Sequence, residues 1–334
     1  MNIKAQVLRQ LVESQGGYLS GEIIAKNLSV SRNAVWKAVA SLCSEGYVIA
    51  ALRKKGYRLE SYGNTLSPAG IYAQLKNESV FHFDVRNSVA STNTLLREMA
   101  AKNLPEGYVL TAEEQTQGKG RMGRSFHSPA KHGIYLSLLL RPASYKTDDS
   151  SLITCAAAVA TARAIEAITN LQVGIKWVND LLIGEKKVCG ILTEATFDME
   201  SGRIDNAVLG IGVNISKPKE GYPDDLESVA TSLIDRHNNF DGIRCRLIAA
   251  ILDEFWGFYV NLSAREFLSE YKARSILLGK DIMVVSNDSI APAKALDIDD
   301  ACRLIVRFDN GETTVLSSGE VSIRQINQAG QATI

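Results

Sequence analysis

Apolar positions near the N-terminus of the chain recur at the spacing of helices. The pattern predicts three helices: the first over residues 3–14, the second after Ser20 and the third after Ser31, because serine often accepts a hydrogen bond at a helix N-terminus. The third helix is apolar along one stripe and polar on the opposite face. The stripe consists of Val35, Ala38, Val39 and Leu42.

Two short β-type runs follow, over residues 47–49 and 57–59, on either side of the basic turn Arg53-Lys54-Lys55-Gly56. Helices, a tight turn and a basic hairpin in this order predict a winged helix-turn-helix domain over residues 1–62. A small helical bundle with a solvated hairpin is the alternative. Residues 63–67, which begin with Gly63 and Asn64, are predicted to form a linker.

Strand-like and helical runs alternate between residues 68 and 275. The predicted strands lie at 108–112, 133–140, 173–177, 189–194 and 206–214. A helix over residues 151–169 is apolar almost all round, which predicts that it is buried, and a second helix is predicted over 244–260. This order favours an α+β domain around a mixed or antiparallel sheet over a regular doubly wound fold.

Short β-type runs fill the C-terminal part of the chain. They are predicted at 280–286, 290–298, 302–308, 312–317 and 321–323, and Asn310-Gly311 is a strong hairpin signal. Residues 276–334 are therefore predicted to form a small β-barrel domain of their own.

The composition is that of a globular protein, with 46% hydrophobic and 22% charged residues in a chain of 334. Lys+Arg and Asp+Glu both number 37, but through residue 62 there are nine cationic side chains against four glutamates. A basic segment in a neutral protein indicates an anionic partner for that segment. The predicted DNA-contacting residues lie on the third helix and the wing. They are Ser31, Arg32, Asn33, Lys37, Arg53, Lys54 and Lys55.

The five cysteines and four histidines show no spacing typical of metal ligands, and no two cysteines form a Cys-x-x-Cys pair. Most of the cysteines are predicted to be buried free thiols in a reducing compartment. The N-terminus lacks the apolar core of a signal peptide, and no run approaches the ~18 apolar residues of a membrane span. These features predict a soluble cytoplasmic protein.

Candidate chemistry begins at the loop Gly118-Lys119-Gly120-Arg121-Met122-Gly123-Arg124, which combines three glycines with three cations. Such a loop can wrap its backbone amides around an anion, and a surface turn with solvated cations is the alternative. The loop lacks the Gly-Lys-Ser/Thr ending of a P-loop. It also lacks the strand–glycine–helix context of a dinucleotide-binding fingerprint.

Three further segments place groups that could contact a ligand beside predicted strands. Lys176-Trp177-Val178-Asn179-Asp180 puts an amide and a carboxylate at a strand end, where a β-turn is the alternative. Lys187 follows a hairpin tip and faces either solvent or a cleft. Gly210-Ile211-Gly212-Val213-Asn214 alternates glycine with apolar residues, which permits close approach by a ligand, and a β-bulge is the alternative.

These segments together resemble the biotin–protein ligases, in particular the bifunctional ligase/repressor class with an N-terminal DNA-binding domain. The resemblance covers essentially the whole chain. It rests on Ser91-Thr92-Asn93, Glu114-Gln115, Gly118 to Arg124, Lys176 to Asp180, Lys187 to Leu192, Gly210 to Asn214 and Ser318 to Arg324. It implies a central catalytic domain of the class II aminoacyl-tRNA synthetase/biotin ligase type and an SH3-like C-terminal domain.

The resemblance implies a two-step reaction. Biotin and ATP, with Mg²⁺, give biotinyl-5′-AMP and pyrophosphate, and a lysine of the biotin carboxyl carrier protein of acetyl-CoA carboxylase then displaces AMP. The implied catalytic residues are Arg121, Lys187 and Asp180. The implied biotin-binding residues are Ser91, Thr92, Asn93, Gln115, Gly118, Lys119, Gly120, Arg121, Lys187 and Gly190. The implied ATP- or adenylate-binding residues are Arg121, Arg124, Phe126, Lys176, Asn179, Lys187, Asn214 and Arg324.

These residue types suit those roles. Two anions, a carboxylate and a triphosphate, react only when cations shield them, which Arg121, Arg124 and Lys187 can do. The uncharged ureido ring needs neutral donors and acceptors such as hydroxyls and an amide. A lysine with a pKa of ~10.4 needs a proton acceptor before it attacks, and Asp180 either assists that step or helps to hold Mg²⁺.

The chain departs from the family pattern at three positions. Met122 and Lys119 stand where the loop of the repressor-type enzyme carries arginines, and Phe126 replaces a tryptophan. Phosphate binding or loop ordering is therefore expected to differ. The class implies operator DNA of biotin synthesis genes as a second partner, bound by a ligand-promoted homodimer. A ligand-sensing regulator without ligase activity and a lipoate–protein ligase are the alternatives.

Overall fold

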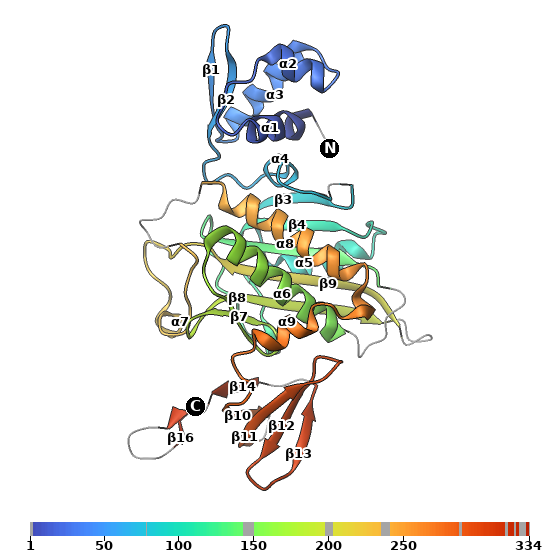
Figure 1. Cartoon of the computed structure of the whole chain (residues 1–334), viewed down its shortest axis with the longest axis vertical. Coiled ribbons are helices and arrows are strands. Elements are labelled where there is room, and N and C mark those ends of the chain that lie inside the picture. The colour runs from blue at the N-terminus through green and yellow to red at the C-terminus, as the bar shows by residue number, and fades with distance from the viewer. Residues whose placement is uncertain are drawn as a thin grey trace.

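The computed structural model describes residues 3–77, 79–142, 150–197, 203–234, 241–286, 289–317, 320–323, 325–326 and 332–333. Three domains follow one another along the long axis of the molecule (Figure 1). The N-terminal domain and its two-stranded wing lie at one end, a large sheet with helices occupies the middle, and a small β domain lies at the other end.

The N-terminal domain is the predicted winged helix-turn-helix. Its helices are α1 (Ile3–Glu13), α2 (Gly21–Asn27) and α3 (Arg32–Ser44), and its wing consists of β1 (Val48–Leu52) and β2 (Gly56–Ser61). The two predicted caps are present: Ser20 Oγ accepts from the amide of Ile23, and Ser31 Oγ accepts from that of Ala34, both at 3.1 Å. The predicted stripe on α3 is buried in the domain core.

The core of this domain extends beyond residue 62, where its boundary was predicted. Ser67 caps a short helix, α4 (Pro68–Tyr72), whose Ala69 packs with Ala73 against the core that α1 forms. Arg9 of α1 also donates to the carbonyl of Leu75 at 2.9 Å. Residues 63–67, which were predicted to be a linker, therefore run between two packed domains and are held by hydrogen bonds on both sides.

The middle domain is built on a seven-stranded sheet of order β3-β4-β5-β9-β8-β7-β6. The strands are β3 (His82–Val89), β4 (Tyr108–Gln115), β5 (Gly133–Leu140), β6 (Gly174–Lys176), β7 (Asp180–Ile183), β8 (Lys186–Phe197) and β9 (Ile204–Asn214). β3 and β4 are parallel and all other neighbours are antiparallel, which confirms the predicted mixed sheet. The sequence pattern missed β3, and it missed β7 as a separate strand.

Helices cover both faces of this sheet. On one face α6 (Ser150–Thr169) packs with α8 (Ile243–Tyr259) over alternate residues of β5, and the short α9 (Leu268–Ala273) also contacts α6. On the other face α5 (Thr92–Ala100) places Leu96 on Leu110, Leu139 and Val208. Within the described residues, α6 is the one helix long and apolar enough to cross a membrane, and it is mostly buried as a core helix, as predicted.

The C-terminal domain is a five-stranded antiparallel sheet of order β13-β12-β11-β10-β14. Its strands are β10 (Asp281–Ser286), β11 (Ser289–Ile298), β12 (Leu304–Phe308), β13 (Thr313–Leu316) and β14 (Glu320–Ile323), close to the predicted ranges. The predicted hairpin forms between β12 and β13, where Gly311 has a φ of 88°. The indole of Trp177 donates to the carbonyl of Cys302 at 2.8 Å and ties this domain to the middle one.

Candidate functional site

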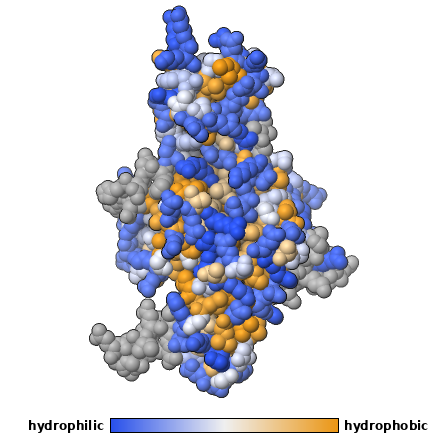
Figure 2. Space-filling model, in the orientation of Figure 1, coloured by the Kyte–Doolittle hydropathy of each residue, from blue (hydrophilic) through white to orange (hydrophobic). Residues whose placement is uncertain are grey.

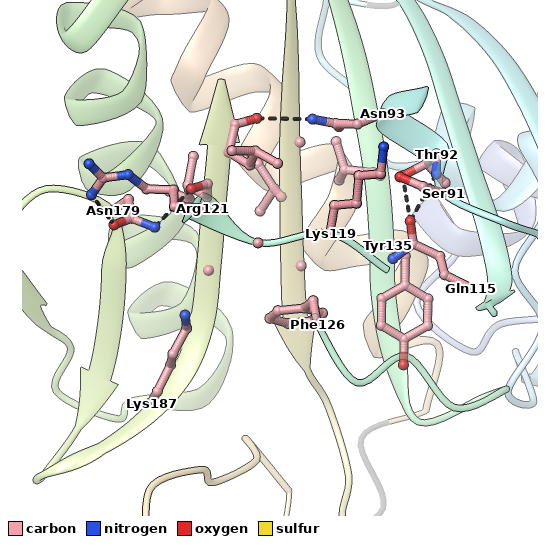
Figure 3. A pocket seen from close by; sticks show the side chains of 18 residues that line it. Ser91, Thr92, Asn93, Gln115, Lys119, Arg121, Phe126, Tyr135, Asn179 and Lys187 are labelled. Carbon is pink, nitrogen blue, oxygen red and sulfur yellow. Dashed lines mark hydrogen bonds between the residues drawn. The ribbon is translucent and has the colours of Figure 1, made fainter. Parts of the chain in front are cut away.

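A pocket of about 460 Å³, partly open to solvent, lies between the N-terminus of α5, the loop 118–126 and the strands β5, β8 and β9 (Figure 3). Residues far apart in the sequence converge on it. Those named from the sequence that line it are Ser91, Thr92, Asn93, Gln115, Lys119, Gly120, Arg121, Phe126, Asn179, Lys187 and Gly190. The structure therefore brings most of the predicted site together.

Neutral hydrogen-bonding groups occupy one end of the pocket. The amide and the hydroxyl of Thr92 both donate to Gln115 Oε1, at 2.8 and 3.0 Å. Gln115 Nε2 in turn donates to Ser128 Oγ at 2.9 Å. The buried hydroxyl of Ser137 lies 2.8 Å from Thr92 Oγ1 and 2.6 Å from Asn93 Oδ1. This network fixes the orientation of each group, as recognition of an uncharged polar ligand requires.

Glycines of β8 and β9 make room for side chains that form the pocket wall. A Cβ atom on Gly210 would lie 2.2 Å from Asn93 Oδ1, and one on Gly212 would lie 2.6 Å from the ring of Phe126. Strand glycines often mark such close approach. The sequence pattern predicted close approach by a ligand at these glycines. In the structure the side chains of Asn93 and Phe126 approach them instead.

We expect Gly210→Ala to raise the KM for the pocket's ligand at least ~10-fold, because the new methyl group displaces Asn93 and so breaks its contact with Ser137. Initial-rate kinetics against ligand concentration measure the effect. Gly257→Ala is the matched control, because Gly257 is an exposed residue of α8 with open space around it. An unchanged KM for Gly210→Ala would contradict this account of the pocket wall.

Cations occupy the other end of the pocket. Arg121 donates to Asn179 Oδ1 at 3.0 Å, and Asn179 Nδ2 donates to the carbonyl of Ile191 at 3.0 Å, so the loop is fastened to β8 (Figure 3). The ammonium of Lys187 lies 2.8 Å from Asp180 Oδ1. Lys119 also lines the pocket. A concave surface that combines three cations with neutral donors can hold an anionic group at one end and an uncharged ring at the other.

A second hollow of about 1280 Å³ adjoins the first, and Gly120, Arg121, Phe126, Asn179 and Lys187 line both. Five further residues named above line the second hollow but not the first. They are Met122, Arg124, Lys176, Trp177 and Asp180. The two hollows together offer a continuous surface from the hydroxyl network of α5 to the carboxylate of Asp180.

Comparison with known proteins agrees with this geometry. Residues 85–214 match the model of the biotin/lipoate A/B protein ligase family, residues 4–58 match a helix-turn-helix (HTH) domain, and residues 277–324 match the biotin protein ligase C-terminal domain. The chain is 40% identical over 236 residues to the bifunctional ligase/repressor BirA of Bacillus spizizenii, covering 69% of this chain and 72% of that protein. The chain belongs to the biotin protein ligase family.

Two other similarities support the family and the fold. The biotin–[acetyl-CoA-carboxylase] ligase of Mycobacterium tuberculosis is 30% identical over 251 residues, which are 71% of this chain and 87% of that protein. The structure of the Aquifex aeolicus biotin protein ligase in complex with biotin and ATP superimposes with a TM-score of 0.60 at 24% identity, over 73% of this chain and 99% of that one. At that identity the superposition supports the fold.

The pocket and its supporting network contain three residues that the sequence analysis did not name. Ser128 and Ser137 complete the hydroxyl network, and Tyr135 lines the pocket beside Phe126 with ring centroids 6.4 Å apart. Burial raises the pKa of the Tyr135 phenol, whose hydroxyl donates to the carbonyl of Pro129. The sequence did offer a signal for Ser137, because it is the one serine in the otherwise apolar strand Gly133–Leu140.

Two predicted site residues stand apart from the pocket lining. Asn214 lines neither hollow, and its amide donates to the carbonyl of Thr231 at 3.0 Å. Gly118 also lines neither, and a Cβ there would lie 2.3 Å from the carbonyl of Phe126, so this glycine closes the base of the loop. Arg324 lies outside the described residues.

The loop departs from the family pattern at its exposed turn. Met122 has a left-handed backbone with a φ of 55° and a side chain that is 64% exposed at the rim of the second hollow. The base of the loop is closed by backbone bonds from Gly120 to Arg124 and from Phe126 to Gly118, at 2.7 and 2.9 Å. The substitution at Met122 therefore leaves the loop's hydrogen-bonded base intact.

The predicted DNA-binding residues are exposed on the N-terminal domain. Ser31 caps α3, and Arg32, Asn33 and Lys37 lie on its solvent face. The wing projects from the domain, and its hydrophilic tip contains Arg53, Lys54 and Lys55 (Figures 1 and 2). Lys54 has a φ of 69°, which lets the turn between β1 and β2 present three adjacent cations.

Proposed function

We propose that this protein makes biotinyl-5′-AMP from biotin and ATP and transfers the biotinyl group to a lysine of the biotin carboxyl carrier protein of acetyl-CoA carboxylase. The observation that carries the proposal is that neutral hydroxyl and amide groups and cationic side chains line the same pocket. A relative named as a biotin–[acetyl-CoA-carboxylase] ligase, 30% identical to this chain, supports the choice of biotin.

In the first step an oxygen of the biotin carboxylate attacks the α-phosphorus of ATP. The bond to the leaving pyrophosphate breaks, and a mixed anhydride of biotin and AMP forms. Both reactants are anions, so Lys187 and Arg121 stabilise the charge that gathers on the α-phosphoryl oxygens. The Thr92–Gln115 network holds the ureido ring at the neutral end, and Phe126 offers an apolar face between the two ends.

In the second step the amine of the carrier lysine attacks the carbonyl carbon of the anhydride. The carbon–oxygen bond to AMP breaks, an amide forms and the amine loses a proton. Asp180 lines the open hollow by which a carrier would approach, and its carboxylate is suited to accept that proton. Lys187, 2.8 Å away, holds the carboxylate at this position.

Mg²⁺ is proposed to accompany ATP. No group of three His, Cys, Asp or Glu side chains able to hold a metal ion occurs among the described residues. Asp180 and Glu185 line the second hollow, and Mg²⁺ is commonly held by one or two carboxylates together with substrate phosphates. The residues present therefore fit an ion that arrives with the nucleotide, whose bound charge would offset that of the phosphates.

Carrier labelling tests the ligase proposal against its two alternatives. The full chain is incubated with ATP and the carrier domain, with biotin alone, lipoate alone or both in competition. We expect ATP-dependent labelling by biotin and none by lipoate. Lipoate transfer would identify a lipoate–protein ligase, and absence of any transfer would leave a ligand-sensing regulator without ligase activity.

A second function is favoured by the winged helix-turn-helix, which the HTH match and the similarity to ligase/repressors support. We propose that the adenylate-bound protein forms a homodimer that binds operator DNA of biotin synthesis genes and represses them. Two copies of α3 would then contact half-sites related by two-fold symmetry. We propose a cytoplasmic location, since operator DNA and the carrier protein would both be met there. Sedimentation with and without biotin plus ATP measures the dimer, and an unchanged monomer would remove this part of the proposal.

We expect Lys54→Ala and Lys55→Ala each to weaken binding to operator and non-operator DNA alike, because a wing-tip cation contacts phosphate. The slope of log affinity against log salt concentration should fall by about one unit for each lysine. Titrations of labelled duplexes over a range of salt concentrations measure it. Lys280→Ala, an exposed lysine beside the C-terminal domain, should leave the slope unchanged. If both wing variants show the same salt dependence of affinity as wild type, the wing does not contact DNA.

A further inference from the structure

A tryptophan lies in the middle of the cationic face of α3. Trp36 is 58% exposed, and its neighbours Val35 and Ala38 are buried, so its ring is directed away from the domain core. A helix turns by about 100° per residue, which puts Trp36 between Arg32 and Asn33 around the helix axis. Trp36 therefore occupies the centre of the surface that the DNA-binding proposal assigns to the major groove.

The charge around Trp36 indicates what covers it. The segment Arg32–Ser44 contains no Asp or Glu, and its exposed face includes Arg32 and Lys37 beside Trp36. The wing tip adds Arg53, Lys54 and Lys55. A second copy of this surface would be repelled by like charge, whereas a polyanion would be attracted. The occupant that fits is duplex DNA.

We propose that Trp36 recognises thymine through the C5-methyl group in the major groove, and so contributes to the choice of operator sequence. This inference rests on the proposed repressor function. The thymine methyl is the apolar group that base pairs present in that groove, and apolar side chains contact it. The flanking Arg32 and Lys37 and the wing cations would position the helix on phosphates, which carry no sequence information directly. Trp36 supplies a contact that depends on the base.

Replacing thymine by uracil tests the contact, because it removes the methyl group and leaves the pairing edge unchanged. The promoter fragment upstream of the biotin synthesis genes is amplified with dTTP or with dUTP. The full chain is titrated against each fragment with biotin and ATP present. We expect wild type to bind the uracil fragment about three- to fivefold more weakly for each methyl group contacted. Trp36→Ala should bind the thymine fragment more weakly and bind both fragments equally.

Two variants control the comparison. Trp36→Phe keeps an apolar ring, so it should retain part of the thymine preference. Val48→Ala changes an apolar side chain of similar exposure, 49%, at the start of the wing strand β1, so it should keep the wild-type preference. Undiminished biotinylation of the carrier by Trp36→Ala would show that the middle domain of this variant is folded, and a far-ultraviolet circular dichroism spectrum equal to that of wild type would show that the N-terminal helices are retained.

The outcomes separate the two proposals. If wild type binds the promoter fragment no better than unrelated DNA, the repressor function is wrong and this inference fails with it. If wild type selects the promoter but binds thymine and uracil fragments equally, or if Trp36→Ala keeps the full preference, the repressor function stands and the role of Trp36 is overturned. A Trp36→Ala variant that loses dimerisation and keeps its thymine preference would instead assign Trp36 to contact between copies.

Discussion

Lys187→Ala is expected to lower the rate of biotinyl-5′-AMP formation by about 10²–10³-fold, the loss typical of removing one group that stabilises developing charge in an active site. Lys187 lines both hollows, so its ammonium lies where we propose that the biotin carboxylate and the α-phosphate meet. Its removal would also leave the carboxylate of Asp180, now 2.8 Å away, without its cation beside two anionic substrates.

The adjacent lysine provides a matched control. Lys186 begins β8, and its ammonium donates to the carbonyl of Glu227 at 3.0 Å on the exposed side of the hairpin. Successive side chains of a strand point to opposite faces, so Lys186→Ala removes a cation of the same kind from the other face. We expect its rate of adenylate formation to stay close to that of wild type.

Pyrophosphate release in the presence of biotin and ATP measures the first step, and reaction of preformed biotinyl-5′-AMP with the carrier measures the second. Arg121→Gly should also impair formation or retention of the adenylate, because Arg121 anchors the loop to Asn179. Normal adenylate formation and carrier labelling by both Lys187→Ala and Arg121→Gly would contradict the assignment of the cationic end of the pocket.

Local sequence patterns were sufficient to predict the helices and strands that are specified by their own residues. The N-terminal helices follow from apolar spacing with Ser20 and Ser31 as caps, and both caps form the expected bonds. β5 and β9 are long, apolar and central, so their pattern was clear. By contrast, β3 has a largely polar and partly exposed sequence, and its place in the sheet depends on parallel pairing with β4. That pairing is a tertiary contact, which local propensity does not encode.

The candidate site likewise contains residues that the sequence predicted and residues that only the fold revealed. Motifs predicted the loop and the residues around Ser91 and Lys187, because their types suit an anion and a neutral ring. The support came from residues distant in the chain: Ser137 lies 45 positions after Thr92, to which it hydrogen-bonds. Asn214 shows the converse, because its amide is bound to the carbonyl of Thr231, a neighbour that only the fold supplies. Residue type alone could not distinguish a ligand contact from a structural one.

The second large effect is expected far from the chemistry, at Arg244 near the start of α8. Arg244→Ala should lower the free energy of unfolding by about 3–5 kcal/mol, because breaking a buried ion pair leaves its partner uncompensated. The Arg244 side chain is only 1% exposed. Its guanidinium donates to both carboxylate oxygens of Glu113, at 2.5 and 3.1 Å, and to Asn64 Oδ1 at 2.8 Å.

An exposed pair in the same domain gives the comparison. Arg97 and Glu194 lie 2.9 Å apart, but the Arg97 side chain is 46% exposed, so Arg97→Ala should cost about 1 kcal/mol or less. Arg244→Lys keeps the charge and loses the fork that binds Glu113 through two nitrogens, so its stability should fall between those of wild type and Arg244→Ala. Scanning calorimetry of the full chain, following the transition of the middle domain, measures all three.

The position of Arg244 gives its loss a second consequence. Glu113 lies on β4 two residues before Gln115 of the pocket, and Asn64 lies in the segment that leads back to the DNA-binding domain. In that segment Thr65 donates to the carbonyl of Glu45, at the end of α3. Removing Arg244 therefore frees the strand that holds the pocket and the segment that orients the recognition helix. An Arg244→Ala variant as stable as Arg97→Ala would show that water or neighbouring groups replace the lost bonds. The bonds from Arg244 to Glu113 and Asn64 would then be dispensable for stability.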